Sequence, residues 1–220
     1  MSEDLLSPFL LSFKLAFLTT LILLVLVMPI AYFISFHTFR FKPIFKAIVS
    51  LPMVLPPTVL GYYLLVAFQP EGVFGALADS VFGIRLVFSF AGLVLGSLIF
   101  SLPFMLNPIL SGIENLPISY LEVAQTLGRS KLYSFVNVLL PNIKPNILNG
   151  IAMTFAHTVG EFGVVLMIGG SIPDETKVAS VAIYQELEAL QYDNANFYAM
   201  LLLIFSFVIL LIINFLGKIK

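Results

Sequence analysis

The sequence contains no cysteine, only two histidines and few charged residues. The lack of cysteine excludes disulfides, thiol chemistry and cysteine-based zinc sites. The histidines, His37 and His157, lie 120 residues apart, so a histidine-based metal site is not expected. No G-x-x-x-x-G-K-[ST] motif occurs, so the chain does not bind ATP through that phosphate-binding loop. No cofactor is therefore expected in the chain itself.

Charged residues make up 10% of the 220 residues and hydrophobic residues 60%, and the mean hydropathy is +1.05. Because a soluble domain carries about 25% charged residues, this composition predicts an all-α integral membrane protein that resides in the lipid bilayer. The net charge of −1 and the lack of a basic cluster give no reason to expect nucleic acid as a partner. Without internal repeats, residues 1–220 are predicted to form one transmembrane domain.

Five apolar stretches predict five membrane spans, at about residues 9–36, 47–68, 86–110, 145–170 and 197–216. The first is expected to be retained, because no basic region precedes it and no small-residue cleavage site follows. Its helix would be about 42 Å long against a hydrocarbon core of about 30 Å, so it must tilt or project. Lys14 is expected to extend to the membrane interface, with anion binding as the alternative.

The positive charges predict the orientation of the chain. Segments 37–46 and 111–145 and the C-terminus hold eight Lys and Arg residues, whereas the opposite side holds Arg85 and Lys177, leaving Lys14 aside. The positive-inside bias then places the N-terminus outside and the C-terminus in the cytoplasm. Residues 69–85 are read as a loop, and VASVAIYQELEAL within the acidic segment 171–196 as a helix at the membrane surface.

The second span is interrupted by LPMVLPPTVLGYY, which contains Pro52, Pro56, Pro57, Thr58 and Gly61. Prolines remove backbone hydrogen bonds, and in lipid the freed carbonyl groups need other partners. This stretch is therefore expected to face protein or an aqueous cavity and to line a solute path. The alternative is a kink that serves packing alone.

The fourth span carries a buried charge that is costly in lipid. Glu161 follows His157 by four residues, the spacing at which two side chains meet on a helix. Two roles are open for this pair: a polar lining of a solute path, or a purely structural hydrogen bond. An enzymatic acid–base role is not favoured, because no nucleophile lies nearby in the sequence. Along such a path, Thr58 and Thr158 are the expected hydroxyl donors to a solute, whereas Glu161 is expected to hold the helix ends around it in place. The candidate path residues here are His157, Thr158, Gly160, Glu161, Phe162 and Gly163.

The loop 111–144 is amphipathic, unlike the spans that flank it. Asn115 is a candidate cap and Pro117 a first-turn residue of a short helix that Gly128 ends in a left-handed turn. Ser130 then caps a second helical run, which Pro141 and Pro145 interrupt. The apolar face predicted to dock in a partner's groove comprises Ile118, Leu121, Ala124 and Gln125. The alternative is a helix resting on lipid headgroups.

This loop resembles the EAA-loop signature of ABC-importer permeases, which reads E-A-A, three residues, G, nine residues and I-x-L-P. Here Glu122, Ala124, Gly128, Leu140 and Pro141 match it, with valine at 123 and 138 in place of alanine and isoleucine. The resemblance implies a type I ABC importer permease fold, in which this loop is the cytoplasmic coupling helix that docks into an ATPase subunit. The implied coupling residues are Leu121, Glu122, Ala124, Gln125, Gly128, Leu140 and Pro141.

Across nearly the whole chain, LPMVLPPTVLGYYLL, LGRSKLYSFVNVLLP and GEFGVVLMIGGSIPDETKVASVAIY resemble the molybdate/tungstate permeases. His157 departs from the small or polar residue expected before GEFG. The resemblance implies a homodimer in the bacterial plasma membrane, two ATP-binding cassette subunits that bind ATP and Mg, and a periplasmic oxyanion-binding protein. The alternatives are a permease for sulfate or another oxyanion and, from a different class, a membrane scaffold without a solute path.

Overall fold

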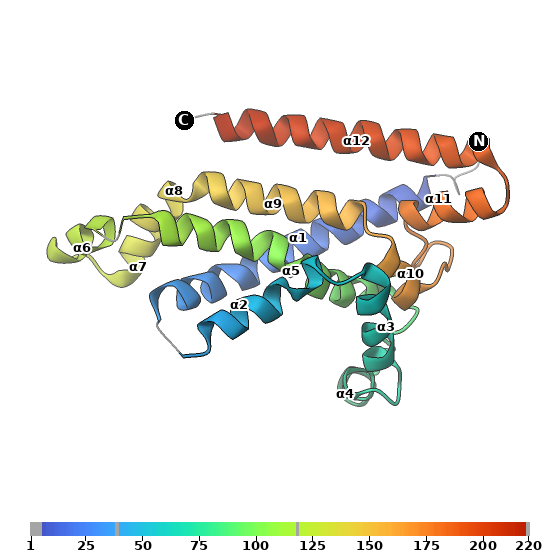
Figure 1. Ribbon diagram of the computed structural model, residues 1–220, viewed down its shortest axis with the longest axis horizontal. Helices are drawn as coiled ribbons and strands as arrows, with labels where there is room; N and C mark the ends of the chain where they lie inside the picture. Colours follow the sequence, from blue (N-terminus) through green and yellow to red (C-terminus); the bar gives the residue numbers. More distant parts are fainter. Residues whose placement is uncertain (1–5, 38–39, 118, 219–220) are drawn as a thin grey trace.

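The long helices α1, α5, α9 and α12 lie along the long axis of the molecule (Figure 1). The structure is a computed structural model that describes residues 6–37, 40–117 and 119–218, and all regular structure in these ranges is helical, as predicted. α1 spans Ser7–Phe36, α5 Phe90–Asn115, α9 Lys144–Val159 and α12 Tyr192–Lys218. α1, α5 and α9 pack against one another, and α12 packs on α9.

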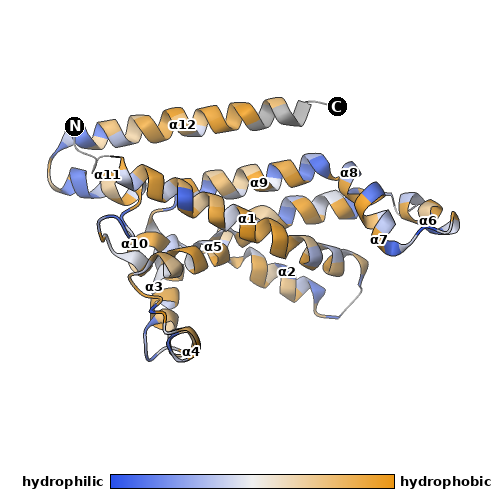
Figure 2. Ribbon diagram, turned by 180° about the vertical axis from the view of Figure 1, so that it is seen from behind, coloured by the Kyte–Doolittle hydropathy of each residue, from blue (hydrophilic) through white to orange (hydrophobic). Residues whose placement is uncertain are grey.

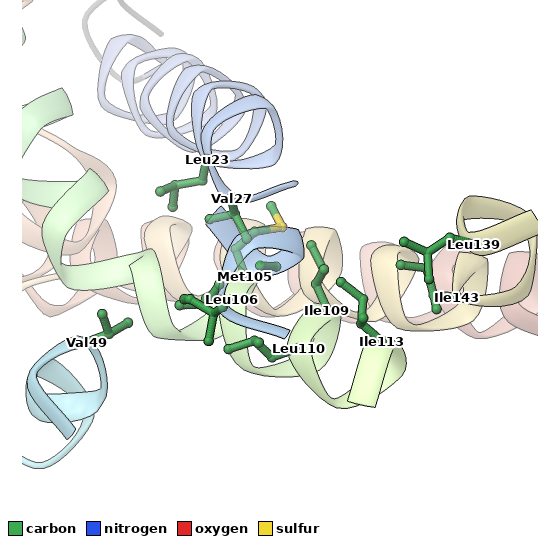
Figure 3. Close-up of a cluster of buried hydrophobic side chains, with 12 residues drawn as sticks. Leu23, Val27, Val49, Met105, Leu106, Ile109, Leu110, Ile113, Leu139 and Ile143 are labelled. Atoms are coloured by element: carbon green, nitrogen blue, oxygen red, sulfur yellow. The ribbon is translucent and has the colours of Figure 1, made fainter. Parts of the chain in front are cut away.

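The core forms where the apolar faces of these helices meet (Figure 3). Leu23 and Val27 of α1, Met105 and Ile109 of α5, and Ile143 just before α9 belong to one cluster of buried side chains. The outer faces are apolar as well, and Figure 2 shows hydrophobic residues along most of α12. Helices that contact protein on one face and lipid on the other are expected to be apolar on both faces.

The predicted count of five spans is reached when bent helices are counted as single spans. α1, α5 and α12 are each long and apolar enough to cross a membrane, and two further pairs of helices satisfy the same test together. The predicted bounds differ from the observed ones mainly at α5. Residues 86–89 precede this helix rather than belong to it, and the helix continues through Asn115. Asn115 is therefore not the cap of the next helix, and its amide instead donates to Ser111 Oγ.

The first bent pair comprises α2 (Lys42–Ser50), a short 3-10 turn (Leu51–Met53) and α3 (Pro57–Phe68), with an angle of 106° at the break. Pro57 occupies the first turn of α3, and Pro56 before it has φ −53° and ψ 134°. A residue that precedes proline is held in this extended region, so the chain leaves α2 and turns sharply. The predicted interruption of this span is therefore present, as a sharp turn between two helices and not as a kink within one helix.

The second bent pair is α9 with α10 (Gly163–Gly169), which meet at 57°. α9 ends at Val159, and Gly160 donates its N–H to Ala156 O and Thr158 O. The stretch 145–170 thus consists of two helices rather than one continuous helix. α10 packs on α3, which brings the two breaks together in space.

The segment predicted as a loop at 69–85 contains a helix, α4 (Val73–Phe82), that ends at Gly83 with φ 64°. α3 and α4 project together from the side of the bundle in both views (Figures 1 and 2).

The predicted surface helix is α11 (Ala179–Glu188), which packs against α12 and α1. Its first N–H groups are partly satisfied by Ser12 Oγ, which accepts from Ala179 N. Lys14 places its Nζ 4.6 Å from the centre of the Phe90 ring.

Candidate functional site

The amphipathic loop folds into α6 (Ser119–Thr126), α7 (Lys131–Ser134), a π-helical turn (Phe135–Leu139) and α8 (Leu140–Asn142). It lies at the opposite end of the molecule from α11 (Figure 1). Gly128 has φ 74°, as its predicted left-handed turn requires, and the N–H of Arg129 donates to Ala124 O. Ser130 caps α7 by accepting from Tyr133 N at 3.2 Å. The helical run after Ser130 is interrupted at Ile143, between Pro141 and Pro145, which lie in the first turns of α8 and α9.

Two residues of the predicted docking face of α6, Leu121 and Ala124, turn toward the chain's own core, whereas Gln125 is exposed. Ala124 is 7% exposed and Leu121 packs against the core cluster around Ile113. Ile118 lies outside the described residues. The apolar side chains that α6 and its C-terminal turn leave open to a partner are Tyr120, Val123 and Leu127, of which Leu127 is 74% exposed.

The remaining predicted coupling residues are reachable from outside to different degrees. Glu122, Gln125, Gly128 and Pro141 are exposed and Leu140 is half-buried. No neighbouring atom lies within 4 Å of a side chain built at Gly128. Among the described residues, the Gly128 position is therefore open on the side where a side chain would lie.

The two breaks enclose a cleft of about 500 Å³. Seven of its lining residues belong to the predicted path, and Phe100 and Ala156 complete the lining. The seven are Pro57, Thr58, His157, Gly160, Glu161, Phe162 and Gly163. Sequence positions about 100 residues apart thus meet in one place, because α3 packs on α10.

Four predicted path residues do not line this cleft. Pro52 and Gly61 are buried, and a side chain at Gly61 would approach Val164 Cα to 3.2 Å. Pro56 is exposed beside the break. Thr158 is also buried, and its hydroxyl donates to Thr154 O at 2.9 Å. Of the two expected hydroxyl donors, only Thr58 is therefore available to a solute.

The predicted contact between His157 and Glu161 is not formed, because α9 ends between them and their helical spacing is lost. Glu161 is 3% exposed, and its Oε2 accepts from Ser97 Oγ at 2.8 Å. Its backbone oxygen accepts from Ser180 Oγ at 2.6 Å. Glu161 therefore joins α5, the α9–α10 connection and α11.

His157 is held by α5. Its ring stacks on Phe104 with centroids 3.9 Å apart, meets Phe100 edge-on, and forms a 2.9 Å hydrogen bond between Nδ1 and Ser101 Oγ. Neither Ser97 nor Ser101 was among the candidate residues identified from the sequence. Their spacing of four residues placed both hydroxyls on one face of α5, and this was the signal that could have identified them.

A larger hollow of about 850 Å³ lies elsewhere, between α3, α4 and residues 83–89. Its lining includes Asp79, Arg85 and Glu175 but none of the predicted path residues. Among the described residues, no group of three or more His, Asp or Glu side chains is placed to hold a metal ion. The cleft between the breaks therefore remains the candidate solute site, since polar side chains of α3, α9 and the α9–α10 connection converge there.

Comparison with known proteins gives concordant results. Residues 27–219 match the family described as binding-protein-dependent transport system inner membrane component. The molybdenum transport system permease protein of Azotobacter vinelandii is 43% identical over 96% of this chain and 93% of its own length. The sulfate transport system permease protein of Salmonella typhimurium is 32% identical over 84% of this chain and 66% of its own.

A solved structure of a bacterial ABC transporter that imports the acidic polysaccharide alginate superposes with a TM-score of 0.81. The match is 20% identical and covers 99% of this chain and 80% of that one. At this identity the likeness concerns the fold, which is that of a type I ABC importer permease.

Proposed function

The chain belongs to the family of inner membrane components of binding-protein-dependent transport systems, and on this premise we propose that it is the permease subunit of an ATP-driven importer of molybdate. The observation that carries the substrate is the 43% identity to a molybdenum transport permease over nearly the full length of both chains. Tungstate, a tetrahedral dianion like molybdate, is included in the proposal. Sulfate is the second candidate, favoured by the 32% identity to a sulfate permease.

The solute path is proposed to run between two copies of the chain, along the cleft formed by the two breaks. Three features support this location: the helix break at Pro57, which has no backbone N–H to donate, a hydroxyl at Thr58, and a buried carboxyl at Glu161. All are expensive in lipid and are tolerated where backbone faces protein or water. Glu161 is proposed to hold the ends of α9 and α10 in place instead of binding the anion.

Two ATP-binding cassette subunits, which bind ATP and Mg, are proposed to supply the energy for transport. A periplasmic oxyanion-binding protein is proposed to deliver the solute. The loop with α6 and α7 would dock into the ATPase subunit through Tyr120, Val123 and Leu127, because these apolar side chains are exposed. The loop would then lie in the cytoplasm, and the positive charges of Arg129, Lys131 and Lys144 support this side of the membrane. ATP-driven closure of the partner subunits would then switch the path between inward- and outward-facing forms.

Gly128→Val tests the docking of this loop. Both Gly128 and Gly83 have positive φ with no atom within 4 Å of a built side chain. A β-branched residue disfavours this conformation by about 1–2 kcal/mol at either position. We expect Gly128→Val to insert normally but to lose ATPase association or transport-coupled ATP hydrolysis. Gly83→Val, at the end of α4, carries the same local strain and is expected to retain both.

The measurement is co-purification with the ATPase subunits, followed by ATP hydrolysis and molybdate uptake in proteoliposomes. Normal assembly and uptake by Gly128→Val would refute the docking proposal. Equal loss in the two variants would mean that general instability is the cause. Sulfate uptake that exceeds molybdate uptake by the unmodified complex would replace the proposed substrate with the second candidate.

A further inference from the structure

A chain of three hydrogen bonds connects α9 and α5 and ends at the ring of His157. Thr158 Oγ1 lies 2.9 Å from Thr154 O, Ser101 Oγ lies 2.9 Å from Thr158 Oγ1, and His157 Nδ1 lies 2.9 Å from Ser101 Oγ. Ser101 and Thr158 are buried, so water does not supply alternative partners.

The direction of each proton along this chain follows from the first acceptor. A carbonyl oxygen accepts only, so Thr158 must donate its single hydroxyl proton to Thr154 O. Thr158 Oγ1 is then the acceptor for the proton of Ser101. With that proton used, Ser101 Oγ accepts from His157, and Nδ1 must carry the hydrogen. The neutral ring therefore has a bare lone pair on Nε2.

His157 Nε2 has no hydrogen-bond partner among the described residues, and the ring lines the cleft. In its neutral form the ring offers the cleft an acceptor and no donor. An oxyanion is itself an acceptor, so neutral His157 cannot bind it. Protonation of Nε2 converts the same atom into a charged donor, and charge-assisted hydrogen bonds are about twice as strong as neutral ones.

Among the described residues, neither lysine nor arginine lines the cleft, so His157 is the one side chain there that can carry a positive charge. Its one acidic residue is Glu161, whose Oε1 has no hydrogen-bond partner among the described residues. The other charged or titratable side chains on helices packed around His157 do not line the cleft. Among the described side chains they are Lys14 and Tyr32 on α1, Tyr62 and Tyr63 on α3, Glu114 on α5, Lys144 on α9, Tyr184, Glu186 and Glu188 on α11, and Tyr192, Asp193 and Tyr198 on α12.

We propose that an oxyanion in this cleft is held by His157 in its doubly protonated form, so that each anion binds together with one proton. The proposal rests on the proposed function, because it assumes that the anion passes through the cleft. The proton comes from water, or from the anion where the anion carries one. The Nε2 lone pair forms the new N–H bond, and the proton returns to water when the anion leaves. Ser101 is a positioning residue that fixes the starting tautomer.

The decisive measurement is molybdate uptake by the reconstituted complex between about pH 6 and pH 8, with ATP hydrolysis measured in parallel to correct for pH effects on the ATPase. Uptake should fall as pH rises. If one proton is required, the steepest decrease is about tenfold per pH unit. His157→Gln supplies an amide donor that does not titrate, so its uptake should persist with a flat pH profile.

Ser101→Ala is the matched test of the tautomer. It removes the acceptor that fixes the proton on Nδ1, so the neutral ring can then carry its proton on Nε2 and donate to an anion. We expect the pH dependence to weaken by severalfold while uptake at about pH 8 increases relative to the unmodified complex. A purely structural role of Ser101 would lower uptake equally at every pH.

Nitrogen-15 magnetic resonance of histidine-labelled complex reports the tautomer directly. The variant His37→Asn leaves His157 as the only histidine of the permease, and unlabelled partner subunits contribute no signal. At high pH without anion, Nδ1 should be protonated and Nε2 bare; with saturating molybdate both should be protonated.

The outcomes separate the inference from the function. A neutral ring protonated on Nε2, or equal pH profiles of the unmodified complex and His157→Gln, would overturn the role of His157 while transport stands. Absence of uptake by the unmodified complex at every pH would instead refute the proposed function.

Discussion

The two breaks that enclose the cleft are made in different ways. The break between α2 and α3 turns by 106° and depends on the backbone restriction imposed by consecutive prolines. The break between α9 and α10 turns by 57° and contains a glycine at either side of Glu161 and Phe162. Proline specifies its own geometry, whereas glycine permits many geometries and requires neighbours to select one.

Those neighbours are visible at the second break. Ser97 donates to the side chain of Glu161 and Ser180 to its backbone, so α5 and α11 fix the connection from two directions. Gly163 lies against Pro57 of the first break. The proline break should therefore tolerate changes of side chain, and the glycine break should be sensitive to changes at positions that contact it.

The largest effect is expected from Gly163→Ala, which acts where the two breaks touch. The added methyl group would lie 2.8 Å from Pro57 Cβ and 3.4 Å from the backbone carbon of Pro57. Neither atom can move without displacing α3, so overpacking should cost about 3 kcal/mol. For a chain of this size we expect the midpoint of thermal unfolding to fall by about 6–12 °C, measured on purified protein in detergent.

Gly160→Ala is the matched control, because the same methyl group there meets nothing closer than 3.6 Å. Its midpoint should lie within about 2 °C of the unmodified protein. Gly160→Leu extends the side chain into the cleft and should block uptake without a comparable loss of stability. Equal destabilisation by the two alanine variants would show that glycine freedom matters more than the contact with Pro57.

A smaller effect is expected from Glu161→Leu, which removes the acceptor of Ser97. The Ser97 hydroxyl is buried, and a buried donor left without an acceptor costs about 1–3 kcal/mol. Glu161→Gln is the control, since its amide oxygen accepts the same hydrogen bond. We expect Glu161→Gln to keep near-normal stability and much of the uptake, and Glu161→Leu to unfold about 2–12 °C lower. Loss of uptake in a stable Glu161→Gln protein would assign the carboxyl a direct role in transport.

The same contrast explains how much of the structure the sequence predicted. Gly128, Ser130 and the prolines at 56 and 57 act through local backbone geometry, and the turn, the cap and the break they predicted are present. The five apolar stretches were equally local signals. They predicted the number of spans but not their ends, since residues 111–115 continue α5 by helical packing on α9.

The errors concern properties that depend on distant partners. Which face of α6 turns inward is decided by the core around Ile113, which presents a surface to Leu121. The partner of Glu161 is Ser97, 64 residues away, while the local candidate His157 is drawn to Ser101. Local spacing suggested the His157–Glu161 pair because a continuous helix was assumed there, and the end of α9 removed that assumption.

The smallest effect is expected from Pro56→Ala, in the break that depends on backbone restriction. Pro56 is exposed, and its φ of −53° and ψ of 134° are accessible to alanine. Its carbonyl still accepts from Val59 N and Leu60 N, because the substitution leaves that oxygen in place. Pro57 continues to hold residue 56 in the extended region, so the turn should persist. The main loss is the restriction of the unfolded chain, about 0.4–1 kcal/mol, or about 1–4 °C in the unfolding midpoint. Uptake should remain near normal. A loss of stability as large as that of Gly163→Ala would mean that the proline break, too, depends on its side-chain contacts.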